Sequence, residues 1–373
     1  MVKLMMLGPY DGKGRYRGGI CTVVNAVLER EEELQQQGVL LMPFDTCRIQ
    51  RKNKDSGKLN LSNIRNSLQL IRDAVSYIKT EQPDVFYLHT SVRLALLKDL
   101  LLLQKVKKKT GIKTVLHIHF AEVENIFTGI KALDSWMLSV IRSCADRLVL
   151  LSQQTLEQFV QLGVAREKCH LLYNFASVAY TTAELQERPA QETRSLLFVG
   201  YIDQRKGIYD ILSVLHQVEH PYRLCVCGDF ENEQAKAQFE GLSKGLEDKL
   251  EFLGFVGGEE KRQVFRDADV LLLPSYGEGL PMVILEALEA GCGVITTDVG
   301  AIPEIVQKEN GIVIKPGDKA ALSQAIETYL TMDAVQLQQQ QQRNHQTAEA
   351  YSLTVFVEKL AEISKAAFSG ESA

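Results

Sequence analysis

The sequence predicts an α/β protein built from two doubly wound domains, each a parallel sheet covered by helices on both faces. Three observations indicate this fold. The chain has 373 residues, which exceeds the size at which one hydrophobic core usually stops growing. Short runs of Val, Ile and Leu alternate with longer amphipathic stretches, as in strand–helix–strand units. This series occurs twice, once on each side of a polar segment at 177–193.

Strands are predicted where a short apolar run is bounded by turn residues. In the first half these runs are Val2–Leu7, Val39–Phe44, Val85–His89, Thr114–Phe120, Leu148–Ser152 and His170–Tyr173. In the second half they are Leu196–Gly200, Leu224–Gly228, Leu250–Leu253, Val270–Pro274, Val294–Thr297 and Ile312–Ile314. Helical periodicity lies between them, as in Ser62–Thr80, Leu94–Lys109, Gly207–Val218 and Pro281–Ala290.

The domain boundaries follow from a change in composition. Residues 177–193 are polar, contain Pro189 and show little apolar periodicity, so they are predicted to be a linker. The first domain is then 1–176 and the second is 194–352. A final amphipathic helix is predicted over Leu353–Phe368.

Composition limits the classes of function. With 45% hydrophobic and 24% charged residues, and no apolar run near the length of a membrane span, the chain is typical of soluble globular proteins. The apolar start is too short for a secretory signal, so a cytoplasmic location is expected. The net charge of −5 argues against general nucleic-acid binding. The seven cysteines include no C-x-x-C pair, which favours reduced thiols over zinc or disulfides.

The charge is unevenly distributed along the chain. Residues 1–176 carry 25 Lys and Arg against 17 Asp and Glu, whereas 177–373 carry 17 against 30. A basic half suits an anionic partner, such as a phosphate-bearing acceptor or a membrane surface. The apolar segment Leu94–Leu103 ends in Lys105, Lys107, Lys108 and Lys109. It is predicted to be either a helix that lies on anionic lipid or a buried crossover helix, and both remain open.

The turn after Val270–Pro274 is the strongest candidate for a binding site. It reads SYGEGLPMVILEALEAG, with Gly277 and Gly279 before a helix in which Pro281 sits just inside the start. Ligands of doubly wound sheets bind where the strands end, and a helix N-terminus attracts phosphate. This turn is therefore predicted to hold a phosphate-bearing ligand.

Two carboxylates lie in this segment. Glu278 stands in the turn and Glu286 about two helical turns later, so one can meet a sugar and the other a ribose. The alternative is that Glu278 only favours the helix dipole and that Glu286 is a surface charge. However, Glu286 is surrounded in sequence by Val283, Ile284 and Leu285. A charge in such a setting is costly without a partner, which favours a functional role.

The segments EGLPMVILEAL and GCGVITTDVGAIPEIV closely resemble the retaining nucleotide-sugar glycosyltransferases of the GT-B fold, in the large fourth family of group 1 type. The resemblance implies two Rossmann-like domains that face each other across a cleft, with the C-terminal helix at 353–373 packed back onto the first domain. It implies that Glu278 contacts the transferred sugar and Glu286 the ribose. It also implies that the turn meets the diphosphate, through Gly279, Leu280, Pro281, Met282 and Val283.

A second match follows Leu196–Gly200, in the segment YIDQRKGIYDIL. A lysine at a strand-to-helix turn can stabilise a developing phosphate charge, and the resemblance assigns that role to Lys206. The family usually has an arginine directly after the glycine, where this chain has Tyr201. We hypothesise that Arg205 supplies the missing cation. The alternative is that both cations are merely solvated at a helix start.

In the first domain, Gly18 and Gly19 begin a helix after the first strand and form a possible anion cradle. The resemblance places such a turn near the donor phosphate, and a helix entry without a ligand is the alternative. The preceding GPYDGKG has neither the spacing of a Walker loop nor that of a dinucleotide-binding turn.

His117 and His119 alternate along one predicted strand and are therefore expected to point to opposite faces. His119, at the strand end, matches the family's terminal histidine, which implies that it positions a hydroxyl or the transferred sugar. His117 is expected to be a packed histidine.

Taken with this resemblance, the sequence predicts a retaining, metal-independent hexosyltransferase, with a UDP-sugar donor favoured and a glycan or lipid-linked acceptor. Its catalytic residues would be Glu278, Lys206 and His119. No cofactor is expected, because Lys206 and the helix dipoles can neutralise the diphosphate. The string Asp267-Ala268-Asp269 resembles the metal signature of another glycosyltransferase fold, but it precedes its strand and so lies at the wrong end of the sheet. The rivals are another nucleotide-sugar enzyme such as an epimerase, and a noncatalytic binding protein.

Overall fold

The computed structural model describes residues 1–10, 18–46, 61–186 and 193–371, with 61–64 described by their backbone only. The chain divides into two compact units. Unit 1 contains Met1–Asn174 together with Leu353–Ala373, and unit 2 contains Phe175–Ser352. Each unit holds one six-stranded sheet whose neighbouring strands all run parallel. The prediction of two doubly wound α/β domains is thereby confirmed.

In unit 1 the sheet has the strand order β2-β1-β3-β4-β5-β6. Its strands are β1 (Val2–Gly8), β2 (Val39–Asp45), β3 (Val85–Thr90), β4 (Lys113–Ile118), β5 (Arg147–Leu150) and β6 (Cys169–Leu171). The helices of this unit are α1 (Gly19–Glu29), α2 (Glu31–Gln36), α3 (Leu61–Glu81), α4 (Leu94–Thr110), α5 (Val123–Ile126), α6 (Lys131–Cys144), α7 (Gln153–Gln161) and α16 (Leu353–Ser369).

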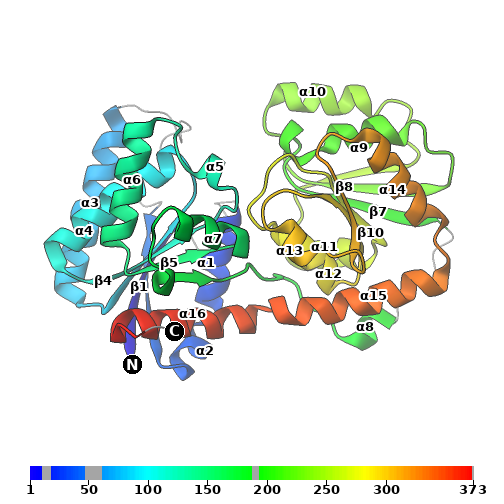
Figure 1. The fold of residues 1–373 in the computed structure, drawn as a ribbon. Coiled ribbons are helices and arrows are strands. Elements are labelled where there is room, and N and C mark those ends of the chain that lie inside the picture. Colours follow the sequence, from blue (N-terminus) through cyan, green and yellow to red (C-terminus); the bar gives the residue numbers. More distant parts are fainter. Residues whose placement is uncertain (11–17, 47–60, 187–192, 372–373) are drawn as a thin grey trace. The chain divides into compact units, whose positions relative to one another are not determined.

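The core of unit 1 follows the alternation of side chains along its strands. Met5 and Leu7 belong to a buried cluster with the apolar sides of α3, α4 and α6, on one face of the sheet. Helices α1 and α16 contact the sheet as well, and α16 packs along β1 to β4 (Figure 1). Phe356 and Leu360 of α16 are buried, and the Arg147 guanidinium donates a hydrogen bond to the Ala366 carbonyl.

In unit 2 the strand order is β12-β11-β10-β7-β8-β9. Its strands are β7 (Arg194–Val199), β8 (Tyr222–Cys227), β9 (Leu250–Gly254), β10 (Val270–Leu273), β11 (Gly293–Thr297) and β12 (Gly311–Ile314). Its helices are α8 (Thr182–Gln186), α9 (Ile208–Leu215), α10 (Glu233–Leu242), α11 (Gly258–Arg266), α12 (Met282–Glu289), α13 (Ile302–Ile305), α14 (Lys319–Thr331) and α15 (Ala334–Ala348).

Both strand orders contain a point at which the winding of the chain reverses. In unit 1 it lies between β1 and β3, and in unit 2 between β7 and β10. At such a point the loops that leave neighbouring strands diverge to opposite faces of the sheet, which leaves a crevice at the carboxyl ends of the strands. Ligand sites are therefore expected at these two places.

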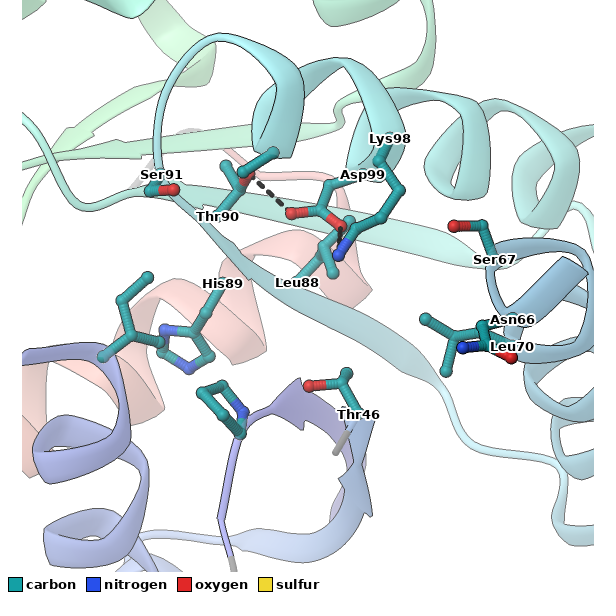
Figure 2. Close-up of a pocket in the computed structure, with 13 residues that line it drawn as sticks. Thr46, Asn66, Ser67, Leu70, Leu88, His89, Thr90, Ser91, Lys98 and Asp99 are labelled. Carbon is teal, nitrogen blue, oxygen red and sulfur yellow. Dashed lines mark hydrogen bonds and ion pairs between the residues drawn. The ribbon is translucent and has the colours of Figure 1, made fainter. Parts of the chain in front are cut away.

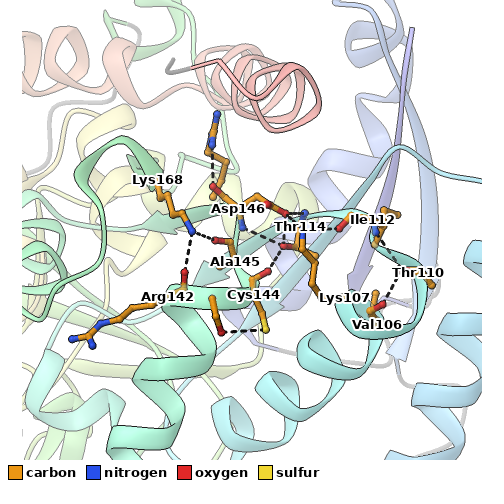
Figure 3. A network of polar contacts seen from close by, with 12 residues as sticks. Val106, Lys107, Thr110, Ile112, Thr114, Arg142, Cys144, Ala145, Asp146 and Lys168 are labelled. Carbon is orange, nitrogen blue, oxygen red and sulfur yellow. Dashed lines mark hydrogen bonds and ion pairs between the residues drawn. The ribbon is translucent and has the colours of Figure 1, made fainter.

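Helix α4 resolves the two alternatives that its sequence left open. Its apolar residues Leu96, Leu100 and Leu103 are buried in the core of unit 1, so this face packs on the sheet and is not exposed for lipid. Lys107 pairs with the Asp146 carboxylate and donates to the Ile112 carbonyl at 3.0 Å (Figure 3). The remaining lysines at this end of the helix, Lys105, Lys108 and Lys109, are exposed.

The predicted linker is corrected by the structure. Its described part packs on unit 2, where Tyr180 is buried and its hydroxyl donates to the Arg262 carbonyl at 2.6 Å. The Arg262 guanidinium lies 4.8 Å from the Tyr180 ring and pairs with Glu184. The polar composition misled the prediction because one aromatic residue anchors the segment. Pro189 lies outside the described residues.

Among the described residues, none of the helices combines the length and the apolar character that a transmembrane span requires. None of the six cysteines in the described part of the chain forms a disulfide, and Cys47 lies outside that part.

Candidate active site

Lys206 and Glu278 meet at the point of unit 2 where the strand order reverses. Lys206 ends a short 3₁₀ turn after β7, and Glu278 lies in the turn after β10. The Lys206 ammonium is 2.5 Å from the Glu278 carboxylate. Gly207, at φ +77°, allows this approach, because a Cβ there would stand 2.2 Å from the Pro274 carbonyl oxygen. Two segments 72 residues apart thus form one ion pair.

Further hydrogen bonds fix this pair. The Ser275 hydroxyl donates to the same Glu278 oxygen at 2.8 Å, and the Asp203 carboxylate accepts from the Lys206 backbone N–H at 2.8 Å. The Glu278 side chain is only 7% exposed and that of Lys206 14%. A carboxylate this buried needs such partners, because leaving it unpaired would cost its full desolvation.

Arg205 lies at the edge of the same turn. Its guanidinium donates to the Gly277 carbonyl at 3.1 Å and lies 3.9 Å from the second Glu278 oxygen. Half of its side chain is exposed. Tyr201, at the position where the family has an arginine, is also exposed. Arg205 therefore brings a cation to this turn, as the sequence-based hypothesis requires.

Glu286 lies on α12 and is fully buried. One of its carboxylate oxygens accepts from the Lys261 ammonium at 2.6 Å and from the Ser177 hydroxyl. The other oxygen, Oε2, is buried and has no hydrogen-bond partner in the described structure. A buried carboxylate oxygen without a partner is able to accept a hydrogen bond from a ligand hydroxyl. The alternative of an exposed surface charge at Glu286 is therefore wrong.

The turn between these two carboxylates is held from behind by the segment after β11. Gly300, at φ +58°, packs so closely that a Cβ would stand 2.4 Å from the Glu278 carbonyl oxygen. The Ala301 backbone N–H donates to the Gly279 carbonyl at 2.9 Å. Helix α12 begins at Met282, so Pro281 occupies the N-cap position and not the first helical one as predicted. The first amides of the helix, at Met282 and Val283, have no intrahelical acceptor.

In unit 1, Gly18 is the N-cap of α1 and Gly19 its first residue. A Cβ at either position would meet nothing within 4 Å, so the backbone there is accessible. The segment GPYDGKG extends into residues that lie outside the described part of the chain.

Three histidines form a cluster at the carboxyl ends of β3 and β4. His89 Nδ1 lies 2.7 Å from His119 Nε2, and the His117 ring stacks on His119 with centroids 3.9 Å apart. The Tyr87 hydroxyl hydrogen-bonds His117 Nδ1 at 3.0 Å. The expectation that His117 and His119 point to opposite faces is wrong, because residues two apart along an extended chain lie on the same face, and the two rings meet there.

These imidazoles are held neutral. Burial lowers the pKa of His119 to about 3. Burial, followed by the neighbouring His119, lowers the pKa of His89 and of His117 well below the ordinary range. The nitrogens of the three rings lie within 4.8 Å of one another, which makes them a possible metal-ligand set. In the structure, two of these nitrogens are engaged with each other, since His89 Nδ1 and His119 Nε2 form a hydrogen bond.

The Asp267-Ala268-Asp269 string has a structural role. The Asp269 carboxylate accepts from the Ser195 backbone N–H at 2.9 Å. This contact lies at the amino ends of β7 and β10, opposite the end that carries Lys206 and Glu278.

Sequence reasoning missed four residues of the site. Ser275 directly follows a predicted strand, a position at which any polar residue could have been examined. His89 is the last residue of the predicted strand Val85–His89, which comes before the strand of His117, and so it also was a polar residue at a strand end. Lys261 and Ser177 carried no signal, since one is a lysine on an exposed-looking helix and the other lay in the predicted linker.

Comparisons with known proteins identify the family. The model described as Glycosyltransferase Family 4 matches residues 27–180, and that described as Glycosyl transferases group 1 matches 182–349. The lipopolysaccharide 1,6-galactosyltransferase of Escherichia coli (strain K12) is 26% identical over 330 residues, which cover 84% of this chain and 86% of that protein. The uncharacterized glycosyltransferase MJ1607 of Methanocaldococcus jannaschii is 30% identical over 145 residues, 38% of this chain but only 36% of that protein.

A solved structure has the same fold. The Anabaena protein Alr3699/HepE, in complex with UDP-glucose, matches with a TM-score of 0.70 and 18% identity, over 97% of this chain and 99% of that one.

Proposed function

The chain belongs to the group 1 glycosyltransferases of family 4, with the GT-B fold, and we propose that it transfers a hexose-type sugar from a UDP-sugar to a glycan or lipid-linked acceptor, with retention of configuration. The main support for the proposed donor is the buried Lys206–Glu278 pair, which lies where the strand order of unit 2 reverses. The choice of UDP is supported by the UDP-glucose bound to the Anabaena protein.

Each part of the donor has a matching group in unit 2. The diphosphate would lie against Lys206, Arg205 and the free amides of Met282 and Val283, since cations and a helix N-terminus stabilise anions. The transferred sugar would donate a hydroxyl to Glu278. The ribose would donate one to the orphaned Oε2 of Glu286.

The chemistry needs a cation that acts mainly in the transition state. As the bond between the sugar and the diphosphate breaks, negative charge develops on the leaving phosphate, and Lys206 is placed to neutralise it. We propose that this phosphate then takes the acceptor hydroxyl proton on the same face of the sugar, which gives retention without a metal. His119, held neutral, would position a hydroxyl of the acceptor or of the transferred sugar.

The related galactosyltransferase from E. coli acts on lipopolysaccharide, which supports a role in bacterial surface polysaccharide or glycolipid synthesis. We propose that the protein works in the cytoplasm on the inner face of the membrane, where Lys105, Lys108 and Lys109 would meet anionic lipid. Flotation with phosphatidylglycerol vesicles checks this: the wild type should float, and a variant with all three lysines changed to Glu should not. A wild type that never floats rejects the membrane contact.

A panel of nucleotide sugars tests the donor. UDP-, GDP-, ADP- and dTDP-sugars are added separately, and the melting temperature is measured. A true donor at 100 times its Kd should stabilise the fold by about 2.7 kcal/mol, and the gain should shrink in Lys206→Ala and Glu286→Gln. Stabilisation by another base alone would refute UDP. Turnover of the donor only in the presence of an acceptor separates a transferase from an epimerase.

A further inference from the structure

A cavity of about 190 Å³ lies within unit 1, at the point where its strand order reverses (Figure 2). Its walls come from the ends of β1 and β3, from Thr46 directly after β2, and from α1, α3 and α4. Its polar side chains include Thr46, Asn66, Ser67, Thr90, Lys98 and Asp99. This location is the crevice at which doubly wound sheets bind ligands. The volume is far above the roughly 10–15 Å³ that one water needs, so a ring-sized ligand fits.

The charges of the cavity cancel. Asp99 is only 8% exposed, and its carboxylate accepts from the Thr90 hydroxyl at 2.8 Å. The Lys98 ammonium lies 3.4 Å from the other Asp99 oxygen. Burial raises the pKa of Asp99. An anionic ligand would therefore meet one lysine already paired with a carboxylate, whereas an uncharged polyol would meet acceptors and donors without adding a buried charge.

The lining is suited to a sugar ring in particular. A carboxylate has about four lone-pair sites, and Thr90 and Lys98 leave some of those on Asp99 free for ligand hydroxyls. Asn66 and Lys98 add donors on the facing helices, as Figure 2 shows. Leu70 and Leu88 also line the cavity and offer an apolar surface to the C–H face of a ring.

The cavity adjoins the histidine cluster. His89 lines it, and the same ring is hydrogen-bonded to His119 at 2.7 Å. An occupant would therefore lie one side chain away from the histidine that is proposed to position the acceptor.

We propose that this cavity binds the terminal sugar of the acceptor, an uncharged monosaccharide unit that donates two hydroxyls to Asp99. This inference rests on the proposed transferase function and assigns the acceptor class. Uncharged means that the bound unit carries neither a phosphate nor a carboxylate.

Saturation-transfer NMR on the full chain, without donor, tests this inference. The probes are the methyl glycosides of glucose, galactose, mannose and N-acetylglucosamine, with glucuronate and glucose 6-phosphate as charged counterparts. At least one neutral glycoside should receive saturation, and its signal should fall at least five-fold in Asp99→Asn and in Ala95→Phe, which fills the cavity. Arg72→Ala, an exposed change on α3, which also lines the cavity, serves as the matched control and should leave the signal unchanged.

Three outcomes would overturn the inference: no saturation of any neutral glycoside, equal saturation in the wild type and both cavity variants, or stronger saturation of a charged sugar. Melting temperatures of the variants show that they are folded. Because the experiment contains no donor, its result is independent of the nucleotide-sugar panel. A protein that fails the donor panel but binds the glycoside refutes the proposed transferase while leaving the cavity as a sugar site.

Discussion

Replacing Lys206 with alanine removes one partner of the buried ion pair in unit 2. Breaking such a pair from one side costs about 3–5 kcal/mol, because the other charge stays buried. Glu278 would keep the Ser275 hydroxyl at 2.8 Å and Arg205 at 3.9 Å, so the lower end, about 3 kcal/mol, is expected. For a unit of this size that corresponds to a fall in Tm of about 6–12 °C.

The assay is urea unfolding of four proteins: the wild type, Lys206→Ala, Glu278→Gln and the double variant. The double variant should recover much of the loss, because a neutral glutamine no longer needs a cation. The matched control is Lys236→Ala in the same unit: its partner Glu240 lies 3.9 Å away, and the two side chains are 49% and 63% exposed, so no buried charge is left behind. Its loss should stay below about 1 kcal/mol.

Sugar transfer gives a second measurement on the same variants. Because Lys206 would stabilise charge that develops in the transition state, its loss should lower kcat by about 10²–10³. A Lys206→Ala protein within about 0.5 kcal/mol of wild type, or a double variant no more stable than the single one, would refute the reasoning about burial. An unchanged kcat would refute the role in catalysis.

The remaining predictions concern the neighbouring groups. Arg205→Ala should raise the KM for the donor about five-fold, because the diphosphate loses its contact with a half-exposed cation. Unchanged donor affinity and turnover would refute the hypothesis that Arg205 replaces the arginine that the family has at the position of Tyr201. Glu286→Gln should weaken UDP binding about ten-fold in calorimetry, since an orphaned acceptor is lost, whereas Glu289→Gln should not. Glu278→Gln should bind free UDP more tightly than the wild type yet transfer sugar more slowly. The pKa of His119 is about 3 in the folded state and 6.5 in the unfolded chain, so its contribution to the free energy of unfolding is complete above pH 6.5 and is lost as the pH falls toward 3. His119→Asn should therefore lose less of its free energy of unfolding between pH 7.5 and pH 5 than the wild type does. An identical loss in the two proteins would contradict a buried neutral ring at His119.

The architecture could be predicted from the sequence because parallel strands buried on both faces leave a strong pattern. Strand β10, for example, reads Val-Leu-Leu-Leu and is buried throughout. The same logic predicted a binding turn after this strand, and the structure brings Glu278 of that turn together with Lys206. Pattern alone could not give the partners of a side chain. Lys261 reaches Glu286 from a helix 25 residues earlier in the chain, and nothing local to Lys261 distinguishes it from other lysines.

Two errors have different physical origins. The prediction that His117 and His119 lie on opposite faces misapplied the alternation of side chains, because residues two apart along a strand lie on the same face. Polar composition indicates a linker only if no residue anchors it, and Tyr180 does. In helix α4, conversely, the apolar run was correct but its partner was the sheet of unit 1, which only the fold could reveal.

The Lys206–Glu278 pair also determines what donor binding must do. In the described structure the cations of the turn are already matched, Lys206 by Glu278 and Arg205 by Glu278 and Asp203. A diphosphate can gain Lys206 only if Glu278 gains another partner, and in the proposed function the hydroxyls of the transferred sugar would be that partner. Free UDP cannot complete this exchange, because it would draw Lys206 away and leave a buried carboxylate uncompensated. A nucleotide that carries its sugar can. The pair would therefore favour the binding of the nucleotide sugar over the binding of the free nucleotide, which promotes release of the product nucleotide. This is why neutralising Glu278 should strengthen the binding of UDP while it weakens transfer.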